Sequence, residues 1–278
     1  MDLMSYLERA TGLDRLIGPA QRTARLLPPG RVRDALYGVW FGHPLHPALV
    51  QVPAGTWLSA SLLDAWPGNE RASRRLVLAG LAASVPAALA GAADWSEQHE
   101  QQMRVGVVHV LANLAAVGLY AASVAVPARA RGLRLAGLAA AGAGGYLGGH
   151  IAHRQASGSN QAEPVPHLVE PGWHDLMPLA ELNQLAVRQP VKRMPGDVPV
   201  VVVRTGDGAA VLADRCGHLS GPLSDGDCRD GTLTCPWHGS TFRLADGGVA
   251  HGPATAPQPA FRTRAADGTL QVCLEGAG

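Results

Sequence analysis

Four long apolar stretches constrain the fold of the first half of this chain more than any other feature. They cover residues 46–66, 76–95, 105–126 and 133–153, and none of them has Lys or Arg in its middle. As a helix, each is long enough to cross the hydrocarbon core of a bilayer, which is about 30 Å thick. The pattern predicts four transmembrane helices contacting membrane lipid. The alternative is a soluble, alanine-rich helical bundle.

Composition agrees with this division of the chain. Hydrophobic residues make up 47% of the sequence and charged residues only 16%, and the apolar excess lies before residue 155. The net charge is +1 and no basic stripe with interleaved aromatic residues occurs, which excludes a nucleic-acid partner. The last apolar stretch is rich in glycine, and small residues at this density permit close helix packing, a flat cofactor or a homodimer.

The chain divides into four parts by composition. Residues 1–42 form an N-terminal segment whose Arg and Leu residues predict an amphipathic helix on the membrane surface. Residues 43–154 form the four-helix domain, and residues 155–166, rich in Ser, Gly, Asn, Gln and Pro, form a linker. Residues 167–278 contain short β-rich runs between Gly-Asp turns. The expected fold class is a membrane all-α four-helix bundle followed by a small all-β domain.

Two cysteines and two histidines in the β-rich part have the spacing of a metal site. Cys216 and His218 are followed, after sixteen residues, by Cys235 and His238, which gives C-x-H-x16-C-x-x-H. Two thiolates can hold one iron of a binuclear cluster, while two neutral imidazoles hold the other and favour its ferrous state. A structural zinc site is the alternative, although zinc sites favour a C-x-x-C knuckle or an H-x3-5-H pair.

The residues around this motif resemble the Rieske iron–sulfur family. The resemblance rests on Cys-Gly-His-Leu-Ser-Gly, on Cys-Pro-Trp-His-Gly-Ser-Thr-Phe and on the later Gly-Pro-Ala, and it covers about residues 165–276. It implies a [2Fe-2S] cluster held by the four residues of the motif. It also implies that Ser240 donates its hydroxyl to a cluster sulfur and raises the reduction potential.

The same resemblance assigns a subtype. High-potential members usually have a tyrosine where Phe242 stands and a disulfide near the cluster, where this chain has Ser220 and Trp237. The resemblance is therefore to the ferredoxin components of oxygenase systems, with a potential toward the low end of the range. Cys228 and Cys273 have no ligand spacing and are expected to be ordinary buried residues.

Histidines gather at one end of the four predicted helices. An even number of spans brings five histidines to the same side of the membrane, together with an aspartate that could orient one imidazole: His43, His46, His109, His150, His153 and Asp94. Two imidazoles on different helices could hold haem b or another metal as axial ligands. The alternative is that these rings lie in the headgroup layer and bind nothing.

The segment Gly-His-Pro-Leu-His-Pro-Ala-Leu at residues 42–49 resembles an uncharacterised bacterial four-helix membrane family that opens with His-Pro-x-x-His-Pro. This resemblance implies the four-helix layout and no activity. We expect a membrane-bound electron-transfer protein whose Rieske cluster exchanges single electrons with a haem or quinone site in the bundle, and with a redox partner protein. A membrane-anchored redox or iron sensor and the ferredoxin component of a membrane oxygenase system are the alternatives.

A self-contained oxygenase would need a separate iron site of two histidines and one carboxylate, and the sequence shows none after the motif. An electron-transfer component of an oxidoreductase system is therefore favoured over a self-contained enzyme. The expected location is the bacterial inner membrane, crossed several times. Arginines are nearly balanced between the two sides, and the lack of protective cysteines near the motif places the Rieske domain in the cytoplasm.

Overall fold

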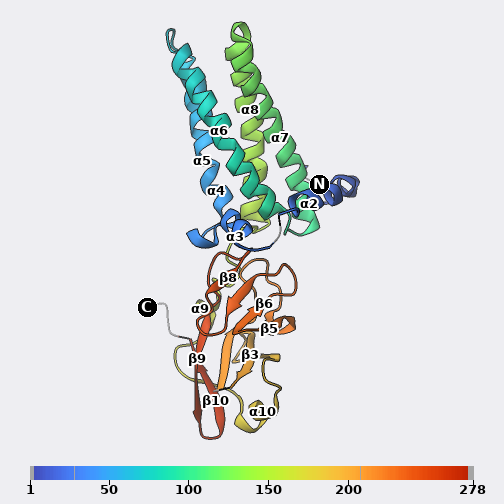
Figure 1. Ribbon diagram of the computed structural model, residues 1–278, viewed down its shortest axis with the longest axis vertical. Helices are drawn as coiled ribbons and strands as arrows, with labels where there is room; N and C mark the ends of the chain where they lie inside the picture. Colours follow the sequence, from blue (N-terminus) through green and yellow to red (C-terminus); the bar gives the residue numbers. More distant parts are fainter. Residues whose placement is uncertain (1–2, 28, 207, 275–278) are drawn as a thin grey trace. The chain divides into compact units, whose positions relative to one another are not determined.

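The computed structural model describes residues 3–27, 29–206 and 208–274, and the chain forms two compact units. The first contains the residues up to Leu36 together with Pro44–Gly158, and it is helical. The second contains Tyr37–His43 and the residues from Ser159 onward, and antiparallel strands dominate it. Figure 1 labels the elements of both units.

The helical unit consists of short N-terminal helices followed by longer ones. In chain order the elements that begin before residue 155 are α1 (Leu3–Glu8), η1 (Thr11–Leu13), α2 (Asp14–Ala24), α3 (Arg31–Tyr37), η2 (Val39–Phe41), α4 (Leu45–Leu49), α5 (Gln51–Leu63), α6 (Glu70–Trp95), α7 (Glu100–Ala125), η3 (Pro127–Arg129), α8 (Ala130–Gly149) and η4 (His150–Arg154). The last of these, η4, is a π-helical turn that continues α8. Of this set, η2 and the last residue of α3 belong to the second unit.

Four of these helices pack around a shared core. The helix α5 contacts α6 and α8, and α7 contacts α6 and α8. Trp57 of α5 stacks on Tyr120 of α7 with ring centroids 4.5 Å apart. Gly137 lets α8 approach, because a Cβ at this position would lie 2.9 Å from the Tyr120 ring. Aromatic residues and glycines together therefore bring the four helices into close contact.

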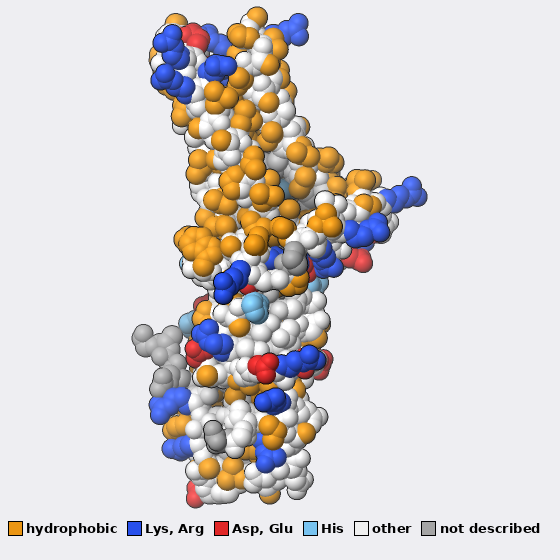
Figure 2. Space-filling view, in the orientation of Figure 1, with side chains coloured by type: hydrophobic (Ala, Val, Ile, Leu, Met, Phe, Trp, Pro, Cys, Tyr) orange, Lys and Arg blue, Asp and Glu red, His pale blue; other side chains and the backbone are white. Residues whose placement is uncertain are grey.

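Two helices, α6 and α7, are long and apolar enough to cross a membrane by length and composition. The first apolar stretch forms α4 and α5, which are separated at Val50, and the last forms the glycine-rich α8. Large apolar side chains on the four long helices face outward, among them Leu58, Leu89, Leu114 and Leu135. Figure 2 shows hydrophobic side chains along these helices and arginines at one end of them. An outward apolar surface of this extent fits lipid contact, and four spans stay a prediction.

The N-terminal helices are docked on the long helices by ion pairs and apolar contacts. Arg104 of α7 donates to the Asp14 carboxylate through Nε at 2.7 Å and through Nη2 at 2.9 Å. Ile17 of α2 packs on Met103 and Val107. The Arg104 guanidinium holds the pKa of Asp14 below its usual range. The amphipathic helix expected in residues 1–42 is thus divided into α1 and α2. Met4 and Ile17 pack against other helices, whereas Leu3 and Leu16 are exposed.

The second unit is built on two antiparallel sheets. Its remaining elements are α9 (Val165–Leu168), β1 (His174–Pro178), α10 (Leu179–Gln184), β2 (Pro190–Arg193), β3 (Val200–Thr205), β4 (Gly208–Ala213), η5 (Leu223–Asp225), β5 (Asp227–Arg229), β6 (Thr232–Thr234), β7 (Thr241–Arg243), β8 (Val249–His251), β9 (Ala260–Ala266) and β10 (Thr269–Cys273). The six-stranded sheet has the order β1-β10-β9-β4-β3-β2, and the four-stranded sheet has the order β5-β6-β7-β8.

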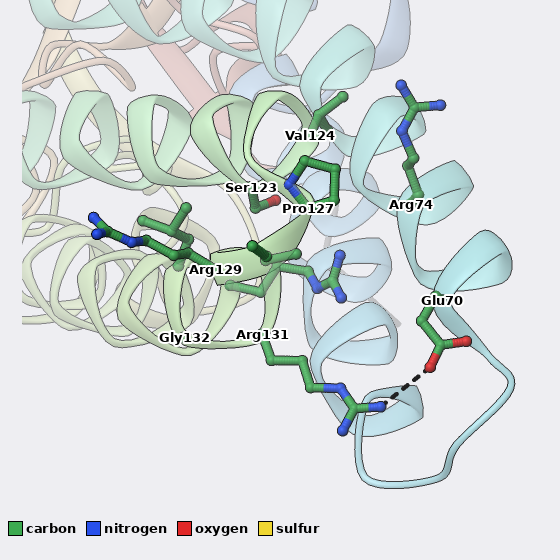
Figure 3. A pocket seen from close by; sticks show the side chains of 12 residues that line it. Glu70, Arg74, Ser123, Val124, Pro127, Arg129, Arg131 and Gly132 are labelled. Atoms are coloured by element: carbon green, nitrogen blue, oxygen red, sulfur yellow. Dashed lines mark hydrogen bonds and ion pairs between the residues drawn. The ribbon is translucent and has the colours of Figure 1, made fainter.

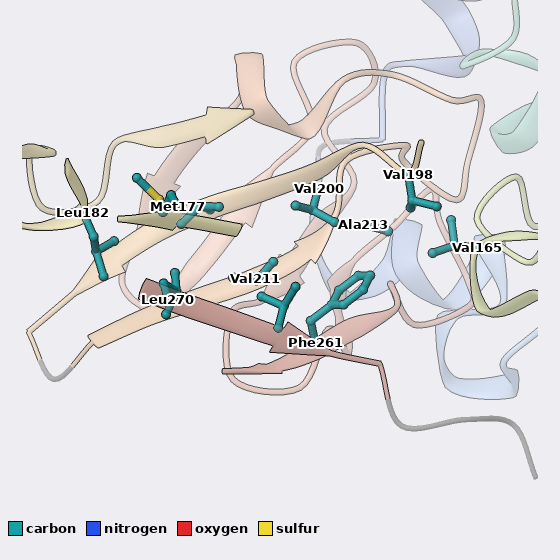
Figure 4. Close-up of a cluster of buried hydrophobic side chains, with 11 residues drawn as sticks. Val165, Met177, Leu182, Val198, Val200, Val211, Ala213, Phe261 and Leu270 are labelled. Atoms are coloured by element: carbon teal, nitrogen blue, oxygen red, sulfur yellow. The ribbon is translucent and has the colours of Figure 1, made fainter. Parts of the chain in front are cut away.

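Side chains of β3 point alternately into two apolar clusters, one on each face of the six-stranded sheet. Val200 and Val202 enter one apolar cluster with Val211 and Phe261 (Figure 4), while Val201 enters a second cluster that contains strand residues of the smaller sheet. Successive side chains of a strand point to opposite faces, so β3 is apolar throughout because both of its faces are buried.

Part of the expected linker belongs to the β unit. Ala162 and Val165 are buried, and Val165 lies in the cluster shown in Figure 4. The backbone N–H of Gln161 donates to the Gly217 carbonyl at 2.8 Å. This stretch was expected to be a linker because most of its residues are polar. Its apolar residues Ala162 and Val165 instead pack into the β unit.

Candidate metal centre

Two loops of the β unit share one construction and carry the four residues of the motif. In the first loop the Cys216 N–H donates to Gly221 O at 2.9 Å, and the Ser220 N–H donates to Cys216 O at 2.9 Å. In the second loop the Cys235 N–H donates to Ser240 O at 2.8 Å, and the Gly239 N–H donates to Cys235 O at 3.1 Å.

Both loops close through a residue with positive φ, Ser220 at 64° and Gly239 at 78°. This conformation suits glycine and costs energy at serine. Each cysteine therefore begins a tight turn, and its histidine follows within the same turn.

The two thiols lie side by side below the surface. Cys216 is 1% exposed and Cys235 is 3% exposed. The Cys216 thiol donates a hydrogen bond to Cys235, which lowers the pKa of Cys235 to about 7. The same bond, together with burial, raises the pKa of Cys216. Backbone N–H groups of Trp237 and His238 further stabilise the Cys235 thiolate, so the site accommodates negative sulfur.

The two imidazoles also meet. The ring centroids of His218 and His238 lie 5.0 Å apart, with the ring planes at 81°. Metal–nitrogen bonds of about 2.0–2.1 Å place two imidazoles of one tetrahedral ion with their centres about 5 Å apart. Both histidines are half-buried, so each presents part of its ring to solvent.

This donor set fits two metal atoms better than one. Over residues 3–27, 29–206 and 208–274, no three His, Cys, Asp or Glu side chains gather around a single metal position. A structural zinc ion requires four donors at one point. A thiol pair beside an imidazole pair instead matches a binuclear cluster with two ligands on each iron.

Ser240 connects the second loop to the thiols. Its side chain is fully buried, and its Oγ accepts the Ala254 N–H at 3.0 Å. With this acceptor position filled, the hydroxyl hydrogen is available to Cys216, whose thiolate form it stabilises. Phe242, two residues later, is fully buried in the apolar cluster around Leu233 and has no hydroxyl to donate.

Sequence reasoning missed the residues that hold the first loop. The buried Gln258 side chain donates to Ala213 O at 2.9 Å and to Arg215 O at 2.5 Å, and it accepts the Gly217 N–H at 3.1 Å. Gln258 is 41 residues from Gly217 in sequence, and no local pattern connects them. Gly221 ends the first motif but was given no role, although a Cβ there would lie 2.8 Å from the Cys235 sulfur.

Tyr37 is a further missed neighbour. It is 3% exposed, and a Cβ at Gly252 would lie 2.6 Å from its ring. The Tyr37 ring therefore covers the Gly-Pro-Ala turn that supplies the Ala254 N–H to Ser240. Tyr37 shares the segment of residues 37–43 with Trp40 and Phe41, and no sequence pattern distinguishes it from them.

The tip of the second loop is exposed and apolar. Trp237 is 50% exposed, and its ring is nearly perpendicular to His238 at a centroid distance of 6.3 Å. Pro236 beside it is also exposed. An exposed aromatic residue next to a half-exposed ligand ring is suited to contact with a protein partner.

The histidines expected in the helical part are separated by the structure. His46 and His109 meet with ring centroids 6.3 Å apart. His150 instead lies 2.9 Å from the Glu8 carboxylate, His153 is exposed, and His43 packs on Phe41 in the second unit. Asp94, in the last turn of α6, has no hydrogen bond to these histidines among the described residues.

A cavity of about 670 Å³ lies at the opposite end of the helices, where α6 begins and α7 ends (Figure 3). Arg74, Arg129 and Arg131 line it, and Arg131 pairs with Glu70 at 3.2 Å. None of the site residues expected from the sequence is among its lining residues.

Comparison with known proteins identifies relatives of the β unit. A family model described as "Rieske [2Fe-2S] domain" matches residues 173–262. The anthranilate 1,2-dioxygenase ferredoxin subunit of Burkholderia cepacia is 31% identical over 36% of this chain and 90% of its own length. Ferredoxin CarAc of Metapseudomonas resinovorans is 32% identical over 37% of this chain and 94% of its own length.

A solved complex of reduced oxygenase and oxidised ferredoxin in carbazole 1,9a-dioxygenase contains a chain that is 25% identical, covering 38% of this chain and 96% of that chain with a TM-score of 0.34. The residues matched by the family model, 173–262, lie within the β unit.

Proposed function

Through residues 173–262 the chain belongs to the Rieske [2Fe-2S] domain family, and from this premise we propose that it is a membrane-anchored one-electron carrier. Cys216 and Cys235 hold one iron in this proposal, and His218 and His238 hold the other. A [2Fe-2S] cluster bound there takes up and releases one electron at a time. The matched loops support the assignment, because they bring the thiols together and place the imidazole centroids 5.0 Å apart.

The chain's own groups set the potential. The Ser240 hydroxyl stabilises sulfur charge and raises the potential, whereas Phe242 contributes no second hydroxyl. The four cysteines are free thiols, so no disulfide stiffens the loops. We place the potential toward the low end of the Rieske range.

The helical unit is the anchor in this proposal. The apolar helices α6 and α7, with the outward leucines of α5 and α8, support insertion in the bacterial inner membrane, with α4–α5 and α8 as further spans. Free cysteines support a cytoplasmic β unit. A reporter enzyme fused to the C-terminus tests this sidedness.

The redox partner docks at the exposed tip formed by Pro236 and Trp237 beside His238. The named relatives are ferredoxins of dioxygenase systems, which favours a second candidate function, the ferredoxin component of a membrane oxygenase system. In either case the protein carries electrons and another component performs the chemistry.

The electron's other partner is a haem or quinone site among the helices, where His46 and His109 meet. A membrane-anchored redox or iron sensor would need no such site. A reduced full-length protein that is reoxidised by neither haem nor a quinone analogue would favour the sensor.

Metal analysis of the whole, anaerobically purified protein tests the cluster assignment. We expect iron and acid-labile sulfide in equal amounts, and their loss in Cys216→Ala and His238→Ala. The matched control is Cys228→Ala, because Cys228 is a buried cysteine outside both loops. Zinc in place of iron in the unaltered protein would contradict the proposal.

A further inference from the structure

We propose that Tyr37 is a positioning residue for the cluster site, and that its ring raises the reduction potential by holding the turn at Gly252–Ala254 against Ser240. The inference deepens the proposed function, on which it rests, by naming a residue that regulates the same site. Tyr37 lies in the sequence far before residues 173–262, the part that the Rieske family model matches.

The segment that contains Tyr37 is one tight turn. It covers Tyr37–His43 and belongs to the β unit. The N–H groups of Phe41 and Gly42 both donate to Gly38 O, at 2.9 and 3.0 Å. Gly38 and Gly42 have φ angles of 87° and 76°, which residues with a side chain rarely adopt. The turn therefore has a fixed shape and directs its side chains to fixed places.

Side chains of this segment divide into a buried pair and an exposed pair. Tyr37 is 3% exposed and Val39 is half-buried, whereas Trp40 and Phe41 are 70% and 46% exposed. A Cβ at Gly252 would lie 2.6 Å from Tyr37 Cδ2 and 3.2 Å from Val39 Cγ2. The buried pair thus packs directly on the backbone of Gly252, and this position has no room for a side chain.

The turn that Tyr37 covers leads by hydrogen bonds to the cluster ligands. Two residues after Gly252, the Ala254 N–H donates to Ser240 Oγ at 3.0 Å, and both residues are buried. A hydroxyl has a single hydrogen, so an oxygen that accepts from Ala254 keeps this hydrogen for Cys216. Accepting one hydrogen bond also strengthens the bond that the same hydroxyl donates.

The direction of the effect follows from charge. An electron added to a [2Fe-2S] cluster increases the negative charge on its sulfurs, so a hydroxyl that donates to sulfur stabilises the reduced state more. When the turn shifts away from Ser240, the hydroxyl loses the Ala254 bond that orients it. Loss of the Tyr37 ring therefore lowers the potential, and by no more than loss of the Ser240 hydroxyl itself.

A purely structural role for Tyr37 is the alternative. Removal of a buried aromatic ring lowers stability in either case. Only a positioning role changes the potential of a cluster that is still assembled, and only a route through Ser240 makes this change depend on the Ser240 hydroxyl. Reduction potentials therefore separate the two roles.

The test is a redox titration of the full-length protein in detergent, followed by the visible absorbance of the cluster. We expect Tyr37→Leu to have a potential between those of the unaltered protein and Ser240→Ala. Tyr37→Phe keeps a ring on Gly252 and should have the unaltered potential. Trp40→Leu is the matched control, because Trp40 belongs to the same segment but is exposed, and it should also leave the potential unchanged.

A double variant tests the route through Ser240. In a Ser240→Ala background, Tyr37→Leu should lower the potential no further, because residues that act through one another are not additive. If Tyr37→Leu assembles no cluster, the milder Val39→Ala replaces it in both comparisons.

An unchanged potential in the assembled variant overturns the inference. So does an equal fall in Trp40→Leu or Tyr37→Phe, or a further fall in the double variant. The electron paramagnetic resonance signal of the reduced, unaltered protein reports separately on the proposed function.

Discussion

At the scale of single residues, the first ligand loop depends on a side chain that lies far from it in the sequence. The spacing of Cys216, His218, Cys235 and His238 was enough to expect two ligand loops, because short turns impose local geometry. Gln258 supports the first loop from 41 residues away, and only the folded chain brings these groups together.

Ser240 gives the sharpest residue-scale prediction. Ser240→Ala removes the hydroxyl that stabilises charge on Cys216, so we expect a lower reduction potential with the cluster still assembled. If the Ser240 hydrogen bond is stronger by about 1.4 kcal/mol in the reduced cluster than in the oxidised cluster, its loss lowers the reduction potential by about 59 mV for one electron. A redox titration followed by visible absorbance measures the shift. Ser224→Ala, outside both ligand loops, should leave the potential unchanged, and an equal shift there would contradict this role.

Gly221 tests the packing of the same site. Gly221→Ala places a Cβ 2.8 Å from the Cys235 sulfur and 3.0 Å from the Trp237 ring, so we expect reduced iron and sulfide content. Gly206→Ala has no atom within 4 Å of the new methyl group and should retain full iron. Normal cluster content in Gly221→Ala would show that the loop moves aside.

At the scale of elements, periodicity and length predicted helices in the first half and short strands in the second. The break between α4 and α5, the π-helical turn η4 and the docking of α1 and α2 were not predictable, because they depend on tertiary contacts. His150 illustrates this: helical spacing grouped it with the other histidines, but Glu8, from α1, binds it at 2.9 Å.

A buried ion pair joins the C-terminal end of α5 to the N-terminal part of α8. Arg134 binds Asp64 through two bonds of 2.5 and 2.7 Å, and their side chains are 4% and 9% exposed. Arg134→Ala leaves a buried carboxylate unpaired, so we expect a loss of about 3–5 kcal/mol of stability. Arg131→Ala breaks an exposed pair with Glu70 and should cost less than about 1 kcal/mol. Thermal unfolding in detergent compares them, and equal effects would contradict the burial argument.

At the scale of the whole molecule, composition predicted two kinds of structure in one chain. It did not predict that Tyr37–His43 belongs with the β unit, because this segment precedes the helices and has no strand pattern. The number of spans also depends on α4–α5 and α8, whose short or glycine-rich sequences give a weaker signal than α6 and α7.

Membrane attachment is the prediction at this scale. The full chain should remain in the membrane fraction after an alkaline carbonate wash and should be released by detergent, because leucines on several helices face outward. A soluble protein of the same cells is the control and should be released by the carbonate wash. Release of the full chain by carbonate would exclude insertion.

The central claim is an iron–sulfur cluster held by sulfur on one iron and nitrogen on the other. Pulsed electron paramagnetic resonance of the reduced full-length protein tests it most directly. The account predicts a binuclear-cluster signal with hyperfine couplings from two imidazole nitrogens, one of which disappears in His218→Cys. A cluster signal without nitrogen coupling, or no signal from protein that contains zinc, would contradict it.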